Sequence, residues 1–236
     1  MAPVTPSITI PSLVVGFVLS LAVSLTARVS RWLTTDGAIA AVLVGTLVYA
    51  SGGWARAGLL VLFFATSSVL TRWQAARKPP PDHTRGRTWT QVLANGAVAT
   101  LLSLLAVDAA PWTAVAFAGA IAASTADTWA TEIGLLAPSA PRLITTGQRI
   151  TRGQSGGITW QGTLAGCIGA AAIAAAGAWW MHTPVVPVVA AGSAAMVIDS
   201  LLGATVEGKG RWITNDVVNA LTTIAGAALA AVLNRS

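Results

Sequence analysis

The chain has 236 residues, of which 54% are hydrophobic and only 9% are charged, and its formal net charge is +6. A soluble domain usually carries roughly 25% charged residues, so the composition excludes an ordinary soluble domain and predicts an integral membrane protein. The single cysteine, Cys167, excludes an internal disulfide and a cysteine metal cluster.

Apolar segments that are long enough to cross about 30 Å of hydrocarbon recur along the whole chain. We expect about eight of them, in this order: 8–27, 37–51, 55–71, 89–107, 112–136, 158–180, 184–203 and 215–233. The second is short and rich in glycine, which is typical of a broken or re-entrant helix. The predicted fold is therefore all-α, a polytopic transmembrane helical bundle that forms a single integral membrane domain over residues 1–236.

The basic residues predict how these helices are oriented. With the N-terminus outside, all 14 lysines and arginines except Arg56 and Arg235 fall on the cytoplasmic side, as the positive-inside rule requires. We expect a multi-pass protein of the cell membrane with cytoplasmic loops near 72–88, 137–157 and 204–214. The positive charge then reflects membrane topology and does not indicate nucleic-acid binding.

Two acidic residues lie in the apolar segment 112–136, although carboxylates at membrane depth cost roughly 2.5–3.5 kcal/mol each and usually mark function. At 100° per residue the polar side chains share a sector of roughly 160°, and the apolar side is expected to face lipid. The sector contains Ser124, Thr125, Asp127, Thr128, Thr131 and Glu132. The alternative is structural: each acid is neutralised by an arginine and locks two helices together.

Three other predicted helices carry polar residues near their cytoplasmic ends. Gln91 and Asn95 share one helix face, and Asp199 lies in an apolar stretch. Asn215, Asp216 and Asn219 begin the last helix, where Asn215 or Asp216 could instead be a helix cap. We expect four carboxylates to converge as ligands of one metal ion, namely Asp127, Glu132, Asp199 and Asp216. Asn215 and Asn219 are expected nearby as further oxygen ligands.

The segment 141–159 contains three arginines, four glycines and no acidic residue. Glycines let backbone N–H groups form an anion nest, and arginine forks suit phosphate oxygens. Together with nearby carboxylates, this pattern indicates a polyphosphate bound with Mg²⁺; topology or anionic lipid alone is the alternative. Asp127, Asp199, Arg142 and Arg149 are the expected catalytic residues. The expected nucleotide and substrate ligands are Gln91, Asn95, Thr131, Thr145, Thr146, Arg152, Gly153, Ser155, Gly156, Gly157, Lys209, Arg211, Asn215 and Asn219.

Six motifs of the chain resemble, in order, the phytyl-phosphate kinase family of the vitamin E pathway: DGAIAAVLVGTLVYASGGW, WTQVLANG, ADTWATEIG, PRLITTGQRITRGQSGG, DSLLGAT and RWITNDVVN. The resemblance covers roughly residues 30–232. It implies transfer of the terminal phosphate of CTP, or of another nucleoside triphosphate, to a phytyl or prenyl monophosphate, giving the diphosphate. It also implies roles for Asp127, Glu132, Arg142 to Gly157, Asp199, Asn215, Asp216 and Asn219.

The motifs leave two other functions open. A cytidylyltransferase that joins CTP to a lipid phosphate would use much the same residues, and its product would be a CDP-lipid instead of CDP. A transporter of isoprenoid phosphates would need polar residues through the full membrane depth, whereas the predicted outer half is nearly bare of them. Oligomeric state and isoprenoid chain length do not follow from the sequence.

Overall fold

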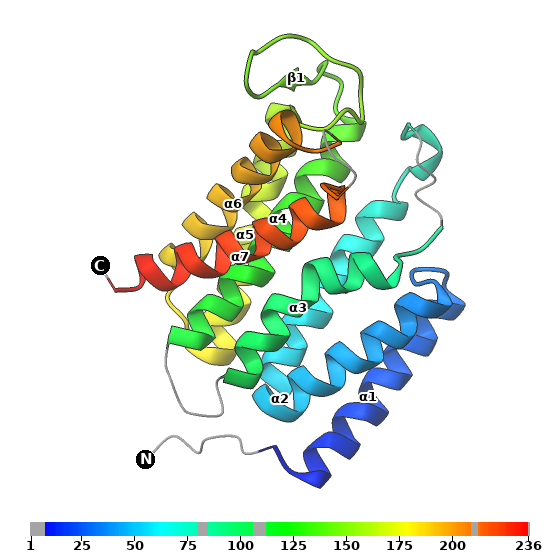
Figure 1. Ribbon diagram of the computed structural model, residues 1–236, viewed down its shortest axis with the longest axis vertical. Coiled ribbons are helices and arrows are strands. Elements are labelled where there is room, and N and C mark those ends of the chain that lie inside the picture. The colour runs from blue at the N-terminus through cyan, green and yellow to red at the C-terminus, as the bar shows by residue number, and fades with distance from the viewer. Residues whose placement is uncertain (1–7, 80–84, 106–111, 209–211, 236) are drawn as a thin grey trace.

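The computed structural model describes residues 8–79, 85–105, 112–208 and 212–235. Figure 1 shows a bundle of helices with a small β-hairpin at one end, which confirms the predicted all-α membrane fold. Within these residues, five helices are long and apolar enough to cross a membrane, namely α1, α2, α5, α6 and α7. In chain order the elements are α1 (Ile10–Val29), α2 (Thr35–Arg72), the 3-10 turn η1 (Ala75–Arg77), α3 (Trp89–Leu105), α4 (Trp112–Leu136), β1 (Arg142–Leu143), β2 (Gly157–Ile158), α5 (Trp160–Met181), α6 (Val185–Thr205) and α7 (Asn215–Leu233).

The predicted spans 37–51 and 55–71 both belong to α2, which is interrupted at Gly53. This glycine has φ 68° and ψ −167°, a conformation that side-chain-bearing residues rarely adopt. Both ends of α2 lie at the same end of the molecule, because the Arg72 guanidinium donates to the Arg31 carbonyl just before α2 begins. The helix therefore turns back at Gly53, and its two arms correspond to two of the roughly eight predicted spans.

A tight contact, which we call the clasp, joins residues 31–37 to residues 85–89. The Thr34 N–H donates to the Arg87 carbonyl at 3.1 Å, and the Arg87 N–H donates to the Trp32 carbonyl at 2.9 Å. A Cβ on Gly37 would lie 2.1 Å from the Arg87 carbonyl oxygen, so this approach requires glycine. The clasp fixes the start of α3 against the start of α2.

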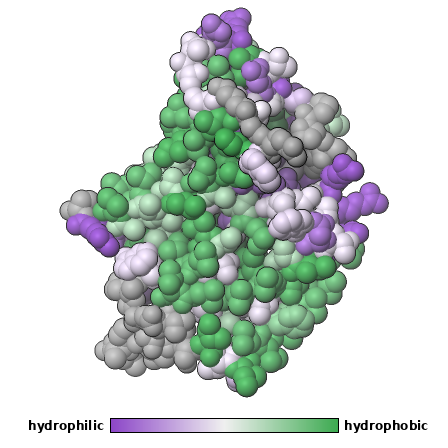
Figure 2. Space-filling view, in the orientation of Figure 1, coloured by the Kyte–Doolittle hydropathy of each residue, from purple (hydrophilic) through white to green (hydrophobic). Residues whose placement is uncertain are grey.

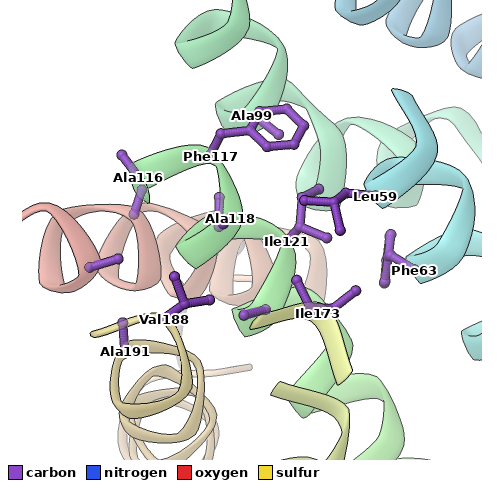
Figure 3. Close-up of a cluster of buried hydrophobic side chains, with 14 of the residues drawn as sticks. Leu59, Phe63, Ala99, Ala116, Phe117, Ala118, Ile121, Ile173, Val188 and Ala191 are labelled. Carbon is purple, nitrogen blue, oxygen red and sulfur yellow. The ribbon is translucent and has the colours of Figure 1, made fainter. Parts of the chain in front are cut away.

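Helix α4 lies in the middle of the bundle and contacts α2, α3, α5, α6 and α7. Every residue from Val115 to Ala126 is buried. The expectation that the apolar side of this helix faces lipid is wrong. Small side chains let neighbouring helices surround α4 at close range: a Cβ on Gly119 would lie 2.5 Å from the Gly226 carbonyl oxygen. Figure 3 shows the surrounding core of Leu59, Phe63, Ala99, Ala116, Phe117, Ala118, Ile121, Ile173, Val188 and Ala191.

The outer surface carries a broad apolar area, as a membrane protein requires. Figure 2 shows apolar side chains over the middle of the molecule and hydrophilic side chains gathered mainly at its upper and right-hand edges. The η1 segment, the β1–β2 hairpin and the start of α7 lie together toward one end (Figure 1). At the opposite end the Trp54 and Trp180 rings pack 5.8 Å apart beside the α2 turn. The described parts of the three loops predicted to be cytoplasmic thus share one end.

Candidate functional site

Asp127 of α4 and Asp199 of α6 form the centre of the candidate site. Both carboxyl groups lie in the lining of one cavity, and the Thr222 hydroxyl of α7 donates to Asp199 Oδ1 at 2.9 Å. The helices approach closely because small residues face one another: a Cβ on Gly192 of α6 would lie 2.9 Å from Ala122 Cβ. Asp127 and Asp199 are thus two of the four carboxylates that were expected to converge.

The pair borders a cavity of ≈ 250 Å³ between α4, α6 and the hairpin segment. Several predicted residues lie in its lining, which brings parts of four separate motifs together. The polar and glycine residues of the lining are Asp127, Thr131, Gly134, Arg152, Gly153, Gln154, Ser155, Gly156, Gly157, Thr159, Gly162, Thr163, Asp199, Ser200, Gly203, Glu207 and Asn215.

Gly156 holds the hairpin segment against α6. Its φ is +76°, and a Cβ there would lie 2.5 Å from Ala204 Cβ. Its carbonyl accepts from the Ile144 N–H at 3.0 Å, which closes the hairpin. Thr159 then caps α5 by accepting from the Gly162 N–H at 3.1 Å. Backbone of the segment therefore forms a wall of the cavity because no side chain intervenes at Gly156.

Arg152 lines the cavity and also ties the hairpin segment to the end of α4. Its guanidinium donates to the carbonyls of Leu135 at 3.3 Å, Pro138 at 3.4 Å and Ser139 at 3.3 Å. A cation at the C-terminal end of a helix is favoured by the helix dipole. The side chain is half-buried, so it can position the wall while its charge still acts in the cavity.

Other predicted phosphate ligands lie on the outer half of the hairpin. Arg142, Arg149, Thr145 and Thr146 are exposed, and the Arg142 guanidinium donates to the Gly147 carbonyl at 2.8 Å. None of these four residues is in the lining of the cavity. Their contact with nucleotide phosphates stays a prediction, and the predicted ligands Lys209 and Arg211 lie outside the described residues.

Glu132 faces away from the cavity, toward α2. It is buried, and its Oε2 lies 2.7 Å from Lys78 Nζ, while Thr71 donates to Oε1 at 2.7 Å. Lys78 also donates to the carbonyl of Leu70 at 2.6 Å. The structure therefore favours, for this acid, the alternative of a pair that locks segments together, with a lysine in the place of the expected arginine.

The start of α7 contributes one residue to the lining, Asn215. Asp216 and Asn219 are half-buried near it, outside the lining. The alternative that Asn215 or Asp216 caps the helix is wrong, because the Thr214 hydroxyl accepts from the Val217 N–H as the cap. The structure therefore does not bring together the expected group of four carboxylates.

Gln91 and Asn95 share one face of α3 as predicted, but they line a second cavity between α1, α2 and α3. Gln91 Oε1 accepts from the Thr88 N–H at 3.1 Å, which caps the start of α3. Asn95 Nδ2 donates to the Gln91 carbonyl at 2.9 Å. These residues are thus separate from the pair of aspartates.

Glu207 is a lining residue that the sequence reasoning missed. It follows the end of α6 and lies near both Asp127 and Asp199. Helical spacing could not have found it, because Glu207 lies beyond the last residue of α6, Thr205. With Glu207 the lining holds three carboxylates and one arginine among the described residues.

These groups can be tested against a Mg²⁺ ion by their donor chemistry. No cluster of three or more histidine, cysteine, aspartate or glutamate side chains close enough to hold a metal occurs within residues 8–79, 85–105, 112–208 and 212–235. Mg²⁺ is usually bound by one or two carboxylates together with waters and substrate phosphates. Asp127 and Asp199, with the Asn215 amide nearby, fit that mode of binding.

The fold and the site define a polytopic helical membrane protein with a carboxylate-lined cavity near one end of its bundle. The chain belongs to the family described as integral membrane protein DUF92, whose model matches residues 18–227. This membership confirms the family resemblance of the six motifs.

Proteins similar to the chain occur in an archaeon and a plant, among other organisms. An uncharacterized membrane protein of Methanocaldococcus jannaschii is 34% identical over 223 residues, which is 92% of each chain. Protein PGR of Arabidopsis thaliana is 31% identical over 75% of this chain and 73% of that protein. Protein VTE6, chloroplastic, of the same plant is 27% identical over 86% of this chain and 66% of that protein. No solved structure matches the chain.

Proposed function

We propose that this protein is a membrane-embedded kinase that transfers the terminal phosphate of a nucleoside triphosphate to an isoprenoid monophosphate, giving the isoprenoid diphosphate. The observation that carries the proposal is the Asp127–Asp199 pair in a cavity walled by the glycine-rich hairpin segment. The motif resemblance to the phytyl-phosphate kinase family supports the substrate class and puts CTP first among the nucleotides.

Electrostatics supports a cation in this cavity. Two carboxyl groups in contact repel each other when both are ionised, unless a proton or a cation lies between them. Arg152, whose donors already serve three carbonyls, does not offset Asp127, Asp199 and Glu207. A polyphosphate would be repelled from such a cavity without further positive charge. Asp127 and Asp199 would hold Mg²⁺, which would neutralise and orient the phosphates when bound.

The transfer needs little covalent assistance from the protein. An oxygen of the acceptor phosphate attacks the terminal phosphorus of the nucleotide, the bond from that phosphorus to the bridging oxygen breaks, and the nucleoside diphosphate leaves. A phosphate monoester is largely ionised near neutral pH, because its second pKa is about 6, so no general base is required. Positioning and charge stabilisation supply most of the rate.

The described residues divide this work between them. Gly153 and Gly156 border the cavity with their backbone, so their N–H groups are available to phosphate oxygens, whereas the Gly157 N–H already donates to the Gln154 carbonyl at 3.2 Å. Arg142 and Arg149, on the exposed outer half of the hairpin, attract the polyphosphate by charge. We place this end of the bundle on the cytoplasmic side of the cell membrane, where the basic loops put it.

Product analysis tests the function directly. Purified protein in lipid nanodiscs is incubated with prenyl monophosphates of several chain lengths and with terminally labelled nucleoside triphosphates. The kinase predicts a labelled prenyl diphosphate and an unlabelled nucleoside diphosphate. A CDP-lipid with release of diphosphate would make the protein a cytidylyltransferase. Binding of the prenyl phosphate without any chemical product would favour the transporter.

A further inference from the structure

A second cavity, of ≈ 350 Å³, lies between α1, the two arms of α2 and the first half of α3. We call it the α1–α3 groove. Its volume is within the range of about 300–1,000 Å³ that is usual for small-molecule sites. The lining is mainly apolar, with Leu19, Val44, Leu60, Phe63 and Phe64 among its residues.

The groove is open along its outer side. Leu19, Val23, Trp54 and Val61 line it and are also 41–62% exposed. Because these side chains belong to the apolar outer surface, the groove opens toward lipid hydrocarbon. An apolar molecule could therefore enter sideways from the bilayer.

Polar character is concentrated where α3 begins. Arg87, Gln91 and Asn95 lie there, and Arg87 is the one charged residue among the described residues that line the groove. Trp54 and Tyr49 lie toward the α2 turn at the other end. The groove thus suits a molecule with one anionic head and a single long apolar tail.

Arg87 is held in place from its backbone. The clasp fixes its N–H and its carbonyl by hydrogen bonds. The preceding residue, Gly86, has φ +80°, and a Cβ there would lie only 2.8 Å from the Arg31 carbonyl oxygen, so this close approach requires glycine. The guanidinium carbon lies 5.3 Å from the centre of the Phe63 ring. A rigid cation against an aromatic wall is typical of an anion-binding position.

The guanidinium of Arg87 makes no hydrogen bond or salt bridge within residues 8–79, 85–105, 112–208 and 212–235. Burial lowers the pKa of Arg87 to about 10, and the charges of Glu132 and Asp127 oppose this effect. It therefore remains protonated at neutral pH, and its guanidinium brings five N–H donors to the lining of the groove. Such a cation is stabilised by a bound anion.

The same electrostatic coupling relates the groove to the candidate catalytic cavity. Arg87 is close enough to Asp127 for their charges to interact, and the Ser124 hydroxyl, one turn before Asp127, donates to the Asn95 carbonyl at 3.4 Å. The polar end of the groove therefore contacts α4 about one helical turn from Asp127.

Resting on the proposed function, we propose that the α1–α3 groove binds the tail of the isoprenoid acceptor and that Arg87 binds its phosphate. The nucleotide and the acceptor then reach α4 from different neighbours, the first from α6 and the hairpin, the second from α2 and α3. Arg28 and Arg31, which border an adjoining open site, help to attract the anionic head to the entrance.

Photolabelling tests the location without requiring phosphoryl transfer. The probe is a prenyl monophosphate with a diazirine in its tail, applied to the full chain in nanodiscs, with cross-linked peptides read by mass spectrometry. We expect labelling of α1, α2 and α3 that an excess of unmodified prenyl monophosphate competes away. The corresponding prenol and a phospholipid should compete at least 10-fold less well. Labelling confined to α5, α6 or α7, or no competed labelling, would overturn the groove.

Two matched pairs of variants sharpen the test. Val61→Trp fills the groove, whereas Val69→Trp places the same ring on the same helix at an exposed position outside it. Arg87→Gln and Arg85→Gln each remove one charge near the entrance. We expect Val61→Trp and Arg87→Gln to raise the apparent Kd for the prenyl phosphate at least 10-fold and the two controls to change it less than threefold. Equal effects within either pair would overturn the assignment.

The readouts separate this inference from the proposed function. Competed labelling of the groove without a phosphorylated product would support the assignment of the groove as the binding site and contradict the proposed kinase function. Formation of prenyl diphosphate with labelling elsewhere would leave the kinase standing and overturn the groove. If Val61→Trp fails to fold, Ala41→Leu on the other arm of α2 provides the same narrowing.

Discussion

Glu132 and Lys78 form a buried ion pair with 2.7 Å between Oε2 and Nζ, five residues along α4 from Asp127, whose carboxyl group lies in the candidate catalytic cavity. Five residues correspond to about 140° around a helix. The two acids therefore face different neighbours, and they allow structural and chemical roles to be tested separately on one helix.

Asp127→Asn is expected to fold normally and to lose activity. The amide has nearly the same volume but is a weaker metal ligand, and each tenfold of rate corresponds to only about 1.4 kcal/mol in the barrier. Phosphoryl transfer should fall at least 100-fold while the melting temperature changes little. Melting temperature and initial rate are measured on the same purified sample. A destabilised variant with full turnover would show that Asp127 is structural.

Glu132→Leu is expected to have the opposite effect. Removing one partner of a buried ion pair leaves Lys78 without its carboxylate and typically costs about 3–5 kcal/mol. The melting temperature should drop, whereas the folded fraction should keep most of its turnover. Lys78→Met combined with Glu132→Leu removes both charges and should recover part of the stability. A stable but inactive Glu132→Leu would return this acid to the catalytic set.

Gly156→Ala is expected to displace the hairpin segment from α6. The new Cβ would lie 2.5 Å from Ala204 Cβ at a residue with φ +76°, so the segment must move and the cavity wall with it. The KM for the nucleotide should rise at least 10-fold. Gly147→Ala is the matched control, because φ there is +70° and nothing lies within 4 Å of its Cβ position. Similar kinetics for the two variants would show that backbone strain, and not the contact with α6, is responsible.

Phosphoryl transfer should require a divalent metal ion, and replacing Asp199 should change which metal ion supports it. Chelation with EDTA is expected to abolish transfer, and Mg²⁺ to restore it. Asp199→Cys replaces a hard oxygen ligand by a soft thiolate, so activity with Mg²⁺ should be lost and a softer ion such as Cd²⁺ should recover part of it. Full activity of the wild-type protein in EDTA would exclude the metal-dependent mechanism.

The orientation of the site can be tested in cells with a single cysteine. In a Cys167→Ser background, a cysteine at the exposed position Gln148 should react with membrane-impermeant maleimide only after the membrane has been opened. A cysteine at Trp54, which is 62% exposed near the α2 turn, should show the opposite pattern. Labelling of position 148 in intact cells would place the candidate site outside.

Local patterns predicted the helices and much of the polar chemistry. Apolar length gave the spans, but the glycine-rich segment 37–51, which was expected to be broken, is continuous helix, and α2 is interrupted only after it, at Gly53. Spacing correctly put Gln91 and Asn95 on one face of α3. These inferences succeed because they depend on the period of a helix, which each short segment carries by itself.

Which helix faces each side chain could not be predicted in the same way. The polar sector of α4 contained both Asp127 and Glu132, but its two edges meet α6 and α2 respectively, which only the tertiary packing decides. Nothing in the sequence separates Arg87 from the other basic residues of the cytoplasmic loops. Its position in the groove depends on a contact with Gly37, which lies 50 residues earlier in the chain. Contacts between distant segments leave no periodic signal.

The central position of α4 also bears on how the protein is made. Its buried stretch consists mostly of alanine, glycine, serine and threonine, with Val115, Phe117 and Ile121 as the larger side chains, and α4 is not among the helices that are long and apolar enough to cross a membrane by themselves. During synthesis this segment emerges before α5, α6 and α7, which later cover most of it. At that stage only α2 and α3 are present to hold it in the bilayer. Its stable integration is then completed by α5, α6 and α7, which are translated later.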